Sequence, residues 1–135
     1  MQVAERMTAN PVVISPTDTL ATARRLMDRG KFRALPVLEN SKLVGIVTDR
    51  DLRKHEGLAG KAVDYLEWTE VTAAMTPNPK TVSPETLTTD AARLLLEQKI
   101  GSLPVVDNGR LVGIVTTSDL LRSILDMQTA QTRAQ

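Results

Sequence analysis

The apolar and polar positions of this chain follow one pattern twice. When the sequence is shifted by 68 residues, residues 7–52 align without a gap with residues 75–120, and 22 of these 46 positions are identical. The agreement is strongest in an apolar run, Leu43–Thr48 in the first copy and Leu111–Thr116 in the second. Because an internal repeat constrains the whole architecture, we expect two copies of one small unit and two copies of one kind of site.

The first half of each copy predicts a short strand followed by a helix. Each copy opens with Met-Thr-x-Asn-Pro, a turn marked by proline, and continues into an extended piece that ends at Ser-Pro. The extended pieces are Val12–Ile14 and Lys80–Val82. Apolar residues then recur at helical spacing within Leu20–Met27 and Ala91–Leu95. Thr17 or Asp18 is the expected cap of the first helix.

The second half of each copy predicts a hairpin and another helix. Apolar residues at consecutive positions indicate strands that are buried on both faces, and Asn108-Gly109 is a hairpin-turn sequence. The expected strands are Leu35–Leu38, Leu43–Thr48, Leu103–Val106 and Leu111–Thr116. Helical patterns follow at Asp49–Lys54 and Thr117–Met127, and the polar residues Gln128–Gln135 are expected to fray. Each repeat is therefore expected to be a β-α-β-β-α unit of the α/β (α+β) class.

Chain length and the lack of cysteine determine how the copies are expected to pack. The 135 residues correspond to one domain, and a unit of about 46 residues is smaller than the roughly 60 that fold alone without disulfides or metal. The chain has no cysteine. We therefore expect the copies to bury apolar faces against each other with pseudo-two-fold symmetry. The expected boundaries are a first domain at 1–60, a linker at 61–70, a second domain at 71–127 and a tail at 128–135.

Charge and composition narrow the classes of partner. The chain has 17 Lys and Arg against 16 Asp and Glu, and its aromatic residues are Phe32, Tyr65 and Trp68. Stacking platforms for single-stranded nucleic acid are missing, so no nucleic-acid partner is expected. Residues 1–6 carry charge and lack the apolar core of a signal peptide. No stretch reaches the roughly 18 apolar residues of a membrane span, so we expect a cytoplasmic protein with no membrane contact.

The candidate chemistry lies in the motif Gly-Ile-Val-Thr-x-x-Asp, at Gly45–Asp51 and Gly113–Asp119, where a strand leads into a helix. Thr and Asp three residues apart at a helix start resemble a capping box, which stabilises a helix by about 0.5–2 kcal/mol. The same helix start offers free N–H groups to a phosphate, and an Asp carboxylate accepts hydrogen bonds from both vicinal hydroxyls of a ribose. The glycine allows either a ligand or a neighbouring strand to approach the backbone. The motif alone leaves both interpretations open.

Four motifs, in the same order in both copies, resemble a known family. They are Met-Thr-x-Asn-Pro, Ser-Pro, Leu-Pro-Val (Leu35–Val37 and Leu103–Val105) and Gly-Ile-Val-Thr-x-x-Asp. Together they resemble the cystathionine-β-synthase (CBS) domain, and two such domains in tandem resemble a CBS pair, also called a Bateman module. The resemblance covers about Val3–Leu125, nearly the whole chain.

The resemblance implies a regulatory module that is not an enzyme and holds neither a metal nor a catalytic cofactor. Such modules bind AMP, ADP, ATP or S-adenosylmethionine in clefts between the two domains. In the family the motif Asp binds the ribose hydroxyls and the Thr lies beside ribose or phosphate, which places these roles on Asp51, Thr48, Asp119 and Thr116. The implied adenine-pocket residues are Ile14, Ala34, Pro36, Val82, Ser102 and Pro104.

The two copies differ beside this motif. The first copy has Arg33 and Arg50 where the second has Gly101 and Ser118. Some nucleotide-binding members of the family carry basic residues at these places and use them on phosphates. One hypothesis is therefore that Arg33 and Arg50 hold the phosphates of AMP or a polyphosphate, while the other cleft takes a less charged adenosine ligand or none. The alternative is that both arginines are solvated surface charges.

The resemblance also implies partners. CBS pairs commonly dimerise, so we expect a homodimer with the helix faces around Leu20–Met27 and Leu120–Met127 as candidate contacts, and an effector protein that receives the signal by conformational change. The main alternative is a CBS pair without ligand that serves only as a scaffold for protein association. A small enzyme is disfavoured because the chain has no Cys, one histidine (His55) and no acidic pair at a recognisable catalytic spacing.

Overall fold

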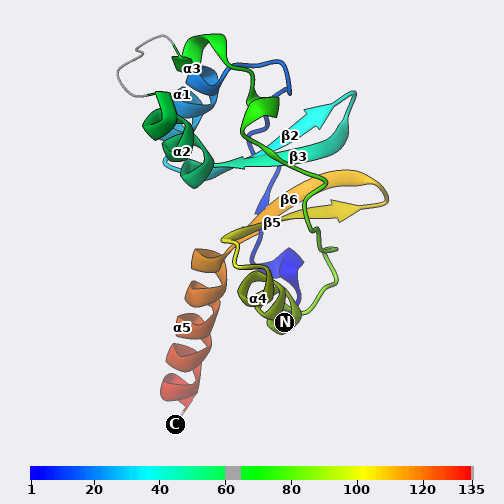
Figure 1. Ribbon diagram of the computed structural model, residues 1–135. Helices are drawn as coiled ribbons and strands as arrows, with labels where there is room; N and C mark the ends of the chain where they lie inside the picture. The colour runs from blue at the N-terminus through cyan, green and yellow to red at the C-terminus, as the bar shows by residue number, and fades with distance from the viewer. Residues whose placement is uncertain (60–64, 135) are drawn as a thin grey trace. The chain divides into compact units, whose positions relative to one another are not determined.

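The computed structural model describes residues 1–59 and 65–134, and the chain forms two compact units (Figure 1). We call Pro11–Pro79 the first-repeat unit, and Met1–Asn10 together with Lys80–Gln135 the second-repeat unit. Each unit contains one three-stranded antiparallel sheet, with strand order β2-β3-β4 in the first and β1-β6-β5 in the second. The mixed helix-and-sheet class predicted from the sequence is confirmed.

The first-repeat unit follows the predicted order of elements. They are α1 (Leu20–Gly30), β2 (Ala34–Glu39), β3 (Lys42–Thr48), α2 (Asp49–Ala59), α3 (Tyr65–Trp68), the 3-10 turn η2 (Val71–Ala73) and β4 (Thr76–Pro77). The strand expected at Val12–Ile14 is reduced to an isolated bridge, in which Ile14 pairs in parallel with Val37. Four of the ten residues of the expected linker, 61–64, lie outside the described residues, and the other six begin with α3.

The second-repeat unit is built in the same way. Its elements are the 3-10 turn η1 (Val3–Glu5), β1 (Thr8–Ala9), α4 (Thr88–Gln98), β5 (Ser102–Asp107), β6 (Arg110–Thr116) and α5 (Thr117–Ala134). The predicted hairpin turn is present, since Asn108 and Gly109 have φ of 50° and 77°, as such a two-residue turn requires. Asn40 and Ser41 form the corresponding turn, also with positive φ.

Each hairpin gains its third strand from a segment ahead of the other repeat. Thr8 of β1 pairs with Ile114 of β6, and Thr76 of β4 pairs with Ile46 of β3. This division differs from the boundaries expected at 1–60 and 71–127, because β3 and β6 would otherwise leave an unpaired edge. The sequence pattern did not show which repeat each opening segment would complete.

The glycines of the repeated motif explain how closely these third strands approach. A Cβ added to Gly45 would lie 2.6 Å from Met75 Sδ, and one added to Gly113 would lie 2.5 Å from Met7 Sδ and 2.9 Å from the carbonyl oxygen of Thr8. A side chain at either place would displace the third strand. Close strand packing, the second interpretation of these glycines, therefore accounts for both of them.

Each unit has its own apolar core. In the first-repeat unit, α1 buries Leu20, Ala23 and Met27 against the β2–β3 hairpin and against Leu52 of α2. The core of the second-repeat unit contains Val3, Val82, Ala91, Leu95, Leu103, Val105, Val115 and Leu120. Leu20 and Met27 are at most 2% exposed, so these two side chains are part of the first core. The homodimer expected through the helix face around Leu20–Met27 stays a prediction.

Three helix ends differ from the sequence expectations. Thr19, rather than Thr17 or Asp18, caps α1, and its hydroxyl accepts the backbone N–H of Thr22 at 3.2 Å. Asp18 accepts the N–H of Ser15 at 2.9 Å instead. The helix α2 continues past its expected end at Lys54 to Ala59, and α5 continues to Ala134 through most of the segment that was expected to fray.

No helix in the described part of the chain is both long and apolar enough to span a membrane.

Candidate functional site

The start of α2 brings Thr48 and Asp51 into direct contact. The backbone N–H and the hydroxyl of Thr48 both donate to Oδ2 of Asp51 at 2.9 Å, and the N–H of Asp51 donates to Oγ1 of Thr48 at 3.2 Å. This reciprocal pair is a capping box. Both residues are half-buried, so the motif forms an ordered, partly accessible acceptor at the helix start.

The start of α5 repeats this arrangement in the second-repeat unit. The N–H of Thr116 donates to Oδ2 of Asp119 at 2.9 Å, and the N–H of Asp119 donates to Oγ1 of Thr116 at 3.2 Å. The other oxygen, Oδ1, accepts from Arg122 at 3.2 Å. The Asp119 side chain is 12% exposed and Arg122 is 70% exposed, so an exposed cation neutralises a largely buried carboxylate.

The two carboxylates therefore have the same orientation but different second contacts. In each, Oδ2 faces the backbone N–H of the Thr, which leaves Oδ1 for another donor. Within residues 1–59 and 65–134, Oδ1 of Asp51 accepts no hydrogen bond, whereas Oδ1 of Asp119 is bound by Arg122. A ligand hydroxyl would bind Asp51 directly, but at Asp119 it would share or displace a surface arginine.

The residues expected to form the adenine pocket come together within each unit. Ala34 lies opposite Thr48 across the β2–β3 ladder, and the N–H of Ile14 donates to the carbonyl of Pro36 at 3.1 Å. In the second-repeat unit, Ser102 lies opposite Thr116 and Val82 donates to Pro104 at 3.1 Å. The structure thus places both sets near the helix starts that carry the motif.

Most of these pocket residues have little exposed side chain. Pro36 and Pro104 are fully buried, and Ile14, Val82 and Ser102 are at most 9% exposed. Ala34 is half-buried. The other five residues therefore offer little surface near the helix starts.

Arg33 and Arg50 lie on either side of the start of α2. The carbonyl of Arg33 accepts the N–H of Asp49 at 2.8 Å, and both arginine side chains are exposed. Neither guanidinium forms an ion pair within the described part of the chain. The same backbone contact joins Gly101 to Thr117 at 3.0 Å in the second-repeat unit, so the two sites share a scaffold and differ in positive charge.

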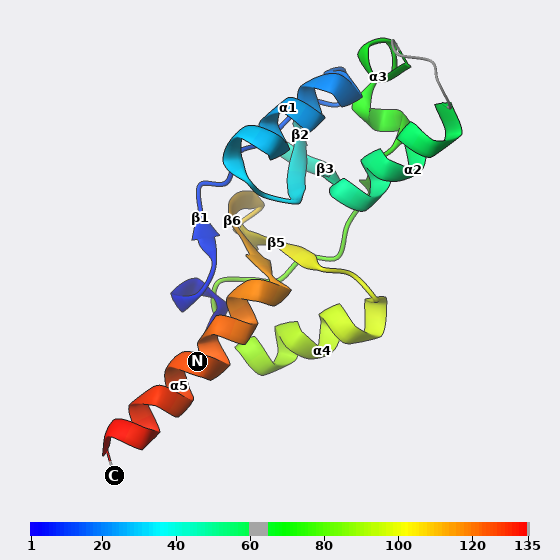
Figure 2. The same ribbon diagram turned by 90° about the vertical axis from the view of Figure 1, so that its left-hand side faces the viewer.

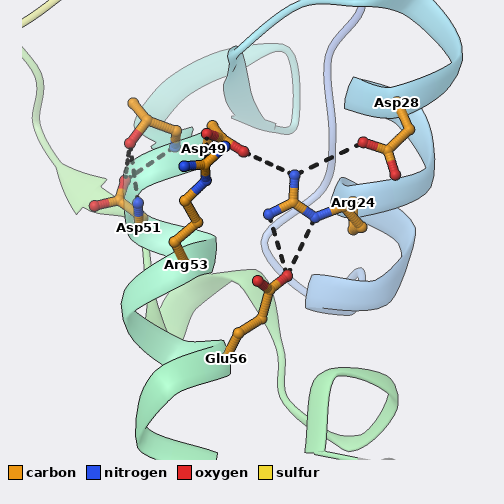
Figure 3. A network of polar contacts seen from close by, with 7 residues as sticks. Arg24, Asp28, Asp49, Asp51, Arg53 and Glu56 are labelled. Carbon is orange, nitrogen blue, oxygen red and sulfur yellow. Dashed lines mark hydrogen bonds and ion pairs between the residues drawn. The ribbon is translucent and has the colours of Figure 1, made fainter.

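A charged network beside the first site was not predicted from the sequence. Arg24 of α1 donates to Asp49 at 2.8 Å and to Glu56 at 3.1 and 3.2 Å, and it lies 3.7 Å from Asp28. Figure 3 shows Asp49 directed towards Arg24, on the other side of α2 from Asp51. Arg53 completes the network through an ion pair with Asp49 at 2.9 Å.

The network changes the ionisation of its two central groups. The hydrogen bond from Arg24 lowers the pKa of Asp49 below its ordinary value, and the charges of Arg53, Arg24 and Arg33 lower it further, while burial opposes them. Burial lowers the pKa of Arg24, but its hydrogen bonds to Asp49 and Glu56 outweigh that effect and raise it. Both groups are therefore charged at neutral pH, and they tie α1 to the start of α2.

The sequence did contain a signal for this network. When the two copies are aligned at the offset of 68 residues, each charged residue of the network lies opposite an uncharged residue of the second copy. The replacements are Arg24 by Ala92, Asp28 by Leu96, Asp49 by Thr117, Arg53 by Leu121 and Glu56 by Ile124. A joint exchange at positions that are far apart along the chain indicates that those positions are in contact.

Comparison with known proteins establishes the family. The CBS domain profile matches residues 3–57 and 69–126, and each range contains one copy of the Thr-x-x-Asp motif. The chain belongs to the CBS domain family. The resemblance inferred from the sequence motifs is therefore confirmed for both repeats of this CBS pair.

Relatives of this chain differ in length, and their solved structures contain different bound ligands. Inosine-5'-monophosphate dehydrogenase of Korarchaeum cryptofilum is 39% identical over 110 residues, which are 81% of this CBS pair but 21% of the dehydrogenase. CBSX2 of Arabidopsis thaliana, solved in complex with AMP, is 36% identical with a TM-score of 0.81, and the match covers 94% of this chain and 98% of CBSX2. The CBS domain pair of MJ0100, solved with 5-methylthioadenosine and S-adenosylmethionine, is 25% identical with a TM-score of 0.80 and covers 94% and 98%.

No cluster of three or more His, Asp or Glu side chains in the described residues is arranged to hold a metal ion. His55 instead contacts Tyr65, with 3.0 Å between Nδ1 and the phenol oxygen and the two rings stacked. This contact joins α2 to α3.

Proposed function

We propose that this CBS pair is a regulatory module that binds an adenosine-containing ligand, such as AMP, ADP, ATP or S-adenosylmethionine, with Asp51 or Asp119 on the ribose hydroxyls. The observation that carries the proposal is the pre-oriented carboxylate at each of two equivalent helix starts. A carboxylate is an acceptor-only group that suits a pair of vicinal hydroxyls. The AMP complex of CBSX2, at 36% identity, supports an adenylate as the ligand.

The two sites are expected to differ in affinity for phosphate. Arg33 and Arg50 add two exposed positive charges near Asp51, at a helix start whose backbone already favours anions. At Asp119 the corresponding residues are Gly101 and Ser118, and Oδ1 of the carboxylate is bound by Arg122. We therefore propose the nucleotide at the first-repeat site, and a less charged adenosine ligand or none at the second.

The module is proposed to regulate rather than to catalyse. Ligand binding at the starts of α2 and α5 would change the surface that an effector protein recognises, and the signal would pass to that protein by conformational change. Within the two sites, the motif carboxylates already accept backbone hydrogen bonds, an arrangement that suits recognition of hydroxyl groups.

The main alternative is a scaffold without ligand, and one observation favours it. Both capping boxes are complete within the protein, so helix stability alone explains why Thr and Asp occupy these positions. The two hypotheses differ in what removal of the negative charge does to adenylate binding.

Isothermal titration calorimetry with AMP, ATP and S-adenosylmethionine tests the proposal. Asp51→Asn keeps an oxygen for the Thr48 N–H but removes the charge, and we expect AMP affinity to fall at least about tenfold, or about 1.4 kcal/mol. Asp119→Asn tests the second site in the same way. Asp18→Asn is the matched control, because Asp18 also accepts the N–H of the residue three positions before it, at 2.9 Å from Ser15.

A thermal-shift measurement with the same ligands distinguishes the scaffold from the ligand-binding module. A bound ligand at 100 times its Kd adds about 2.7 kcal/mol to the stability of the folded protein, so a thermal-shift measurement at millimolar concentration registers any specific adenylate. If none of the ligands shifts the transition of the wild-type chain, or if Asp18→Asn weakens binding as much as Asp51→Asn, the proposed function is wrong.

A further inference from the structure

The charged network beside the first site includes Asp49, a residue of the Thr-x-x-Asp motif itself. Asp49 stands between Thr48 and Arg50 at the start of α2, so it is next in sequence to an arginine proposed to bind phosphate. An unpaired carboxylate at this place would act against an anionic ligand, because it would repel the phosphates and pair with the arginines that hold them. The contacts of Asp49 therefore affect what the first site binds.

Two arginines bind both oxygens of the Asp49 carboxylate. Oδ1 accepts a hydrogen bond from Arg24 of α1 at 2.8 Å, and Oδ2 forms an ion pair with Arg53 at 2.9 Å. The helices α1 and α2 lie next to each other in Figures 1 and 2. In Figure 3 the Asp49 side chain is directed towards α1, while Asp51 lies on the other side of α2. The network thus holds the Asp49 charge away from the carboxylate proposed to bind ribose.

Arg24 is the better fixed of the two arginines. Its side chain is 23% exposed, against 75% for Arg53, and it also donates to Glu56 at 3.1 and 3.2 Å. A planar guanidinium that several acceptors already hold loses little freedom for each hydrogen bond. An exposed ion pair within one helix, such as Arg53 with Asp49, contributes little. The position of the Asp49 carboxylate therefore depends mainly on Arg24.

Arg33 is a second cation close to Asp49. The N–H of Asp49 donates to the carbonyl of Arg33 at 2.8 Å, so the two backbones are in contact. The hydrogen bond from Arg24 lowers the pKa of Asp49, and the charges of Arg53, Arg24 and Arg33 lower it further. Among residues 1–59 and 65–134 the Arg33 guanidinium forms no ion pair. An Asp49 that Arg24 did not hold would compete with a ligand phosphate for this arginine.

We propose that Arg24 is a positioning residue for the phosphates of the nucleotide, because it holds Asp49 against α1 and so leaves Arg33 and Arg50 available to the ligand. The proposal rests on the proposed function and adds to it a specificity determinant that touches no ligand atom. Arg24 acts through Asp49 alone, so its effect is confined to the charged part of the ligand. A ligand without phosphate binds equally well with or without Arg24.

The second repeat supports this role. At the offset of 68 residues, Ala92 and Thr117 lie opposite Arg24 and Asp49, and the second repeat also lacks both arginines that the first site offers to phosphate. The carboxylate, its partner and the two free arginines are thus present together in one repeat and absent together from the other. A network that only joined two helices gives no reason for this association, since α4 and α5 have apolar side chains at the same positions.

Titration calorimetry of the full chain with ATP and with adenosine tests the proposal. Arg24→Met keeps the aliphatic stem but releases Asp49, so ATP affinity is expected to fall about fivefold or more while adenosine affinity stays within about twofold. Arg24→Met/Asp49→Asn removes the competing charge as well, and it is expected to restore ATP affinity to within about twofold of the wild type. Asp49→Asn alone is expected to leave ATP affinity unchanged or to raise it.

Arg25→Met is the matched control. Arg25 is the next residue of α1, its side chain is exposed, and its guanidinium donates to the hydroxyl of Thr22 at 3.2 Å. The control removes the same charge from the same helix without releasing Asp49, so the ratio of ATP to adenosine affinity should not change. If Arg24→Met does not fold, Asp49→Asn and Arg24→Ala/Asp49→Thr, which has the residues of the second repeat, decide the proposal. Both are expected to bind ATP at least as tightly as the wild type.

The outcomes separate this proposal from the proposed function. The loss of ATP affinity in Arg24→Met is expected to shrink at high salt, because salt screens the charges that cause it. Equal losses for ATP and adenosine in Arg24→Met, a loss of ATP affinity in Asp49→Asn, or an equal effect of Arg25→Met would overturn the positioning role and leave adenylate binding in place. A wild-type chain that binds neither ATP nor adenosine would overturn the proposed function, and the positioning role with it.

Discussion

One local arrangement, a side-chain oxygen that accepts the backbone N–H three residues earlier, occurs five times among the described residues. Glu5, Asp18 and Thr86 accept in this way from Gln2, Ser15 and Ser83, and Asp51 and Asp119 accept from the Thr residues of the repeated motif. The last two differ from the others because they lie inside the first turn of an α-helix of eleven or eighteen residues, whereas Asp18 and Thr86 lie two residues before α1 and α4. At Asp51 and Asp119 the carboxylate stands among the free N–H groups that attract an anion.

Arg50 separates the hypotheses of a phosphate ligand and of a solvated surface charge. If Arg50 binds phosphate, Arg50→Ala removes a charge-assisted hydrogen bond of about 1.5–3 kcal/mol, so ATP affinity falls about tenfold or more while adenosine affinity stays nearly constant. Titration calorimetry with both ligands measures the difference. Arg29→Ala, at an exposed arginine in the last turn of α1, is the control. Equal losses for ATP and adenosine would show that Arg50 is a surface charge.

Residue patterns predicted the capping boxes correctly because the Thr, the Asp and their spacing all lie within one helical turn. They placed the cap of α1 wrongly because Thr17, Asp18 and Thr19 are all good capping residues. In the structure Thr19 accepts the N–H of Thr22 and Asp18 accepts the N–H of Ser15, and the sequence does not show which of three adjacent residues makes which contact. The contact between Arg24 and Asp49 joins residues of two different helices, so no local pattern contained it.

At the scale of elements, the two repeats use one framework with two kinds of contact between their helices. Charged groups join α1 to α2, whereas α4 and α5 have apolar side chains at the same positions. The hairpins were predicted well because apolar runs and turn residues are local signals. The length of α5 was underestimated because its C-terminal residues are polar, and polarity alone does not distinguish a tail from a helix with one exposed, uncharged face.

The network between α1 and α2 is expected to stabilise the first-repeat unit in a pH-dependent way. Asp49→Asn should lower the free energy of unfolding by about 1–3 kcal/mol at pH 7, since it weakens a largely buried charged hydrogen bond. The pKa of Asp49 is lowered in the folded state, so its contribution is complete above the unfolded pKa of about 3.9 and is lost as the pH falls through the folded value. Urea unfolding at several pH values measures this.

Asp28→Asn is the matched control for that experiment. Asp28 also faces Arg24, at 3.7 Å, but its side chain is 68% exposed, and exposed pairs contribute about 0–1 kcal/mol. The difference between Asp49→Asn and the wild type should shrink below about pH 4. A difference that stays constant down to acid pH would mean that Asp49 stabilises the helix start by shape rather than by charge.

At the scale of the whole molecule, the connectivity of the units is the feature that sequence reading did not predict. A repeat alignment compares residues that are equivalent, and it does not report which residues pack together. Met7 and Met75 are equivalent, yet Met7 lies against Gly113 and Met75 against Gly45. The folding unit is therefore offset from the repeating unit, by the length of the segment that supplies the third strand.

Removal of residues 1–10 should consequently destabilise the second repeat rather than the first. The segment supplies β1 and gives hydrogen bonds to the second repeat, from Val3 to Thr86 at 2.8 Å and from Ala4 to Pro84 at 2.9 Å. Hydrogen exchange followed by mass spectrometry should show faster exchange in β6 and α4, with β2 and β3 unchanged. Faster exchange in β3 instead would show that the opening segment belongs to the first repeat.

The separation of β1 from β6 along the chain has a consequence for protein synthesis. The first-repeat unit, Pro11–Pro79, is continuous and is free to fold as soon as it leaves the ribosome. The first ten residues emerge earlier, but the strand that they pair with ends at Thr116, and at about 5–20 residues per second it follows several seconds later. During nascent-chain elongation β1 thus lacks its pairing strand until β6 has been translated.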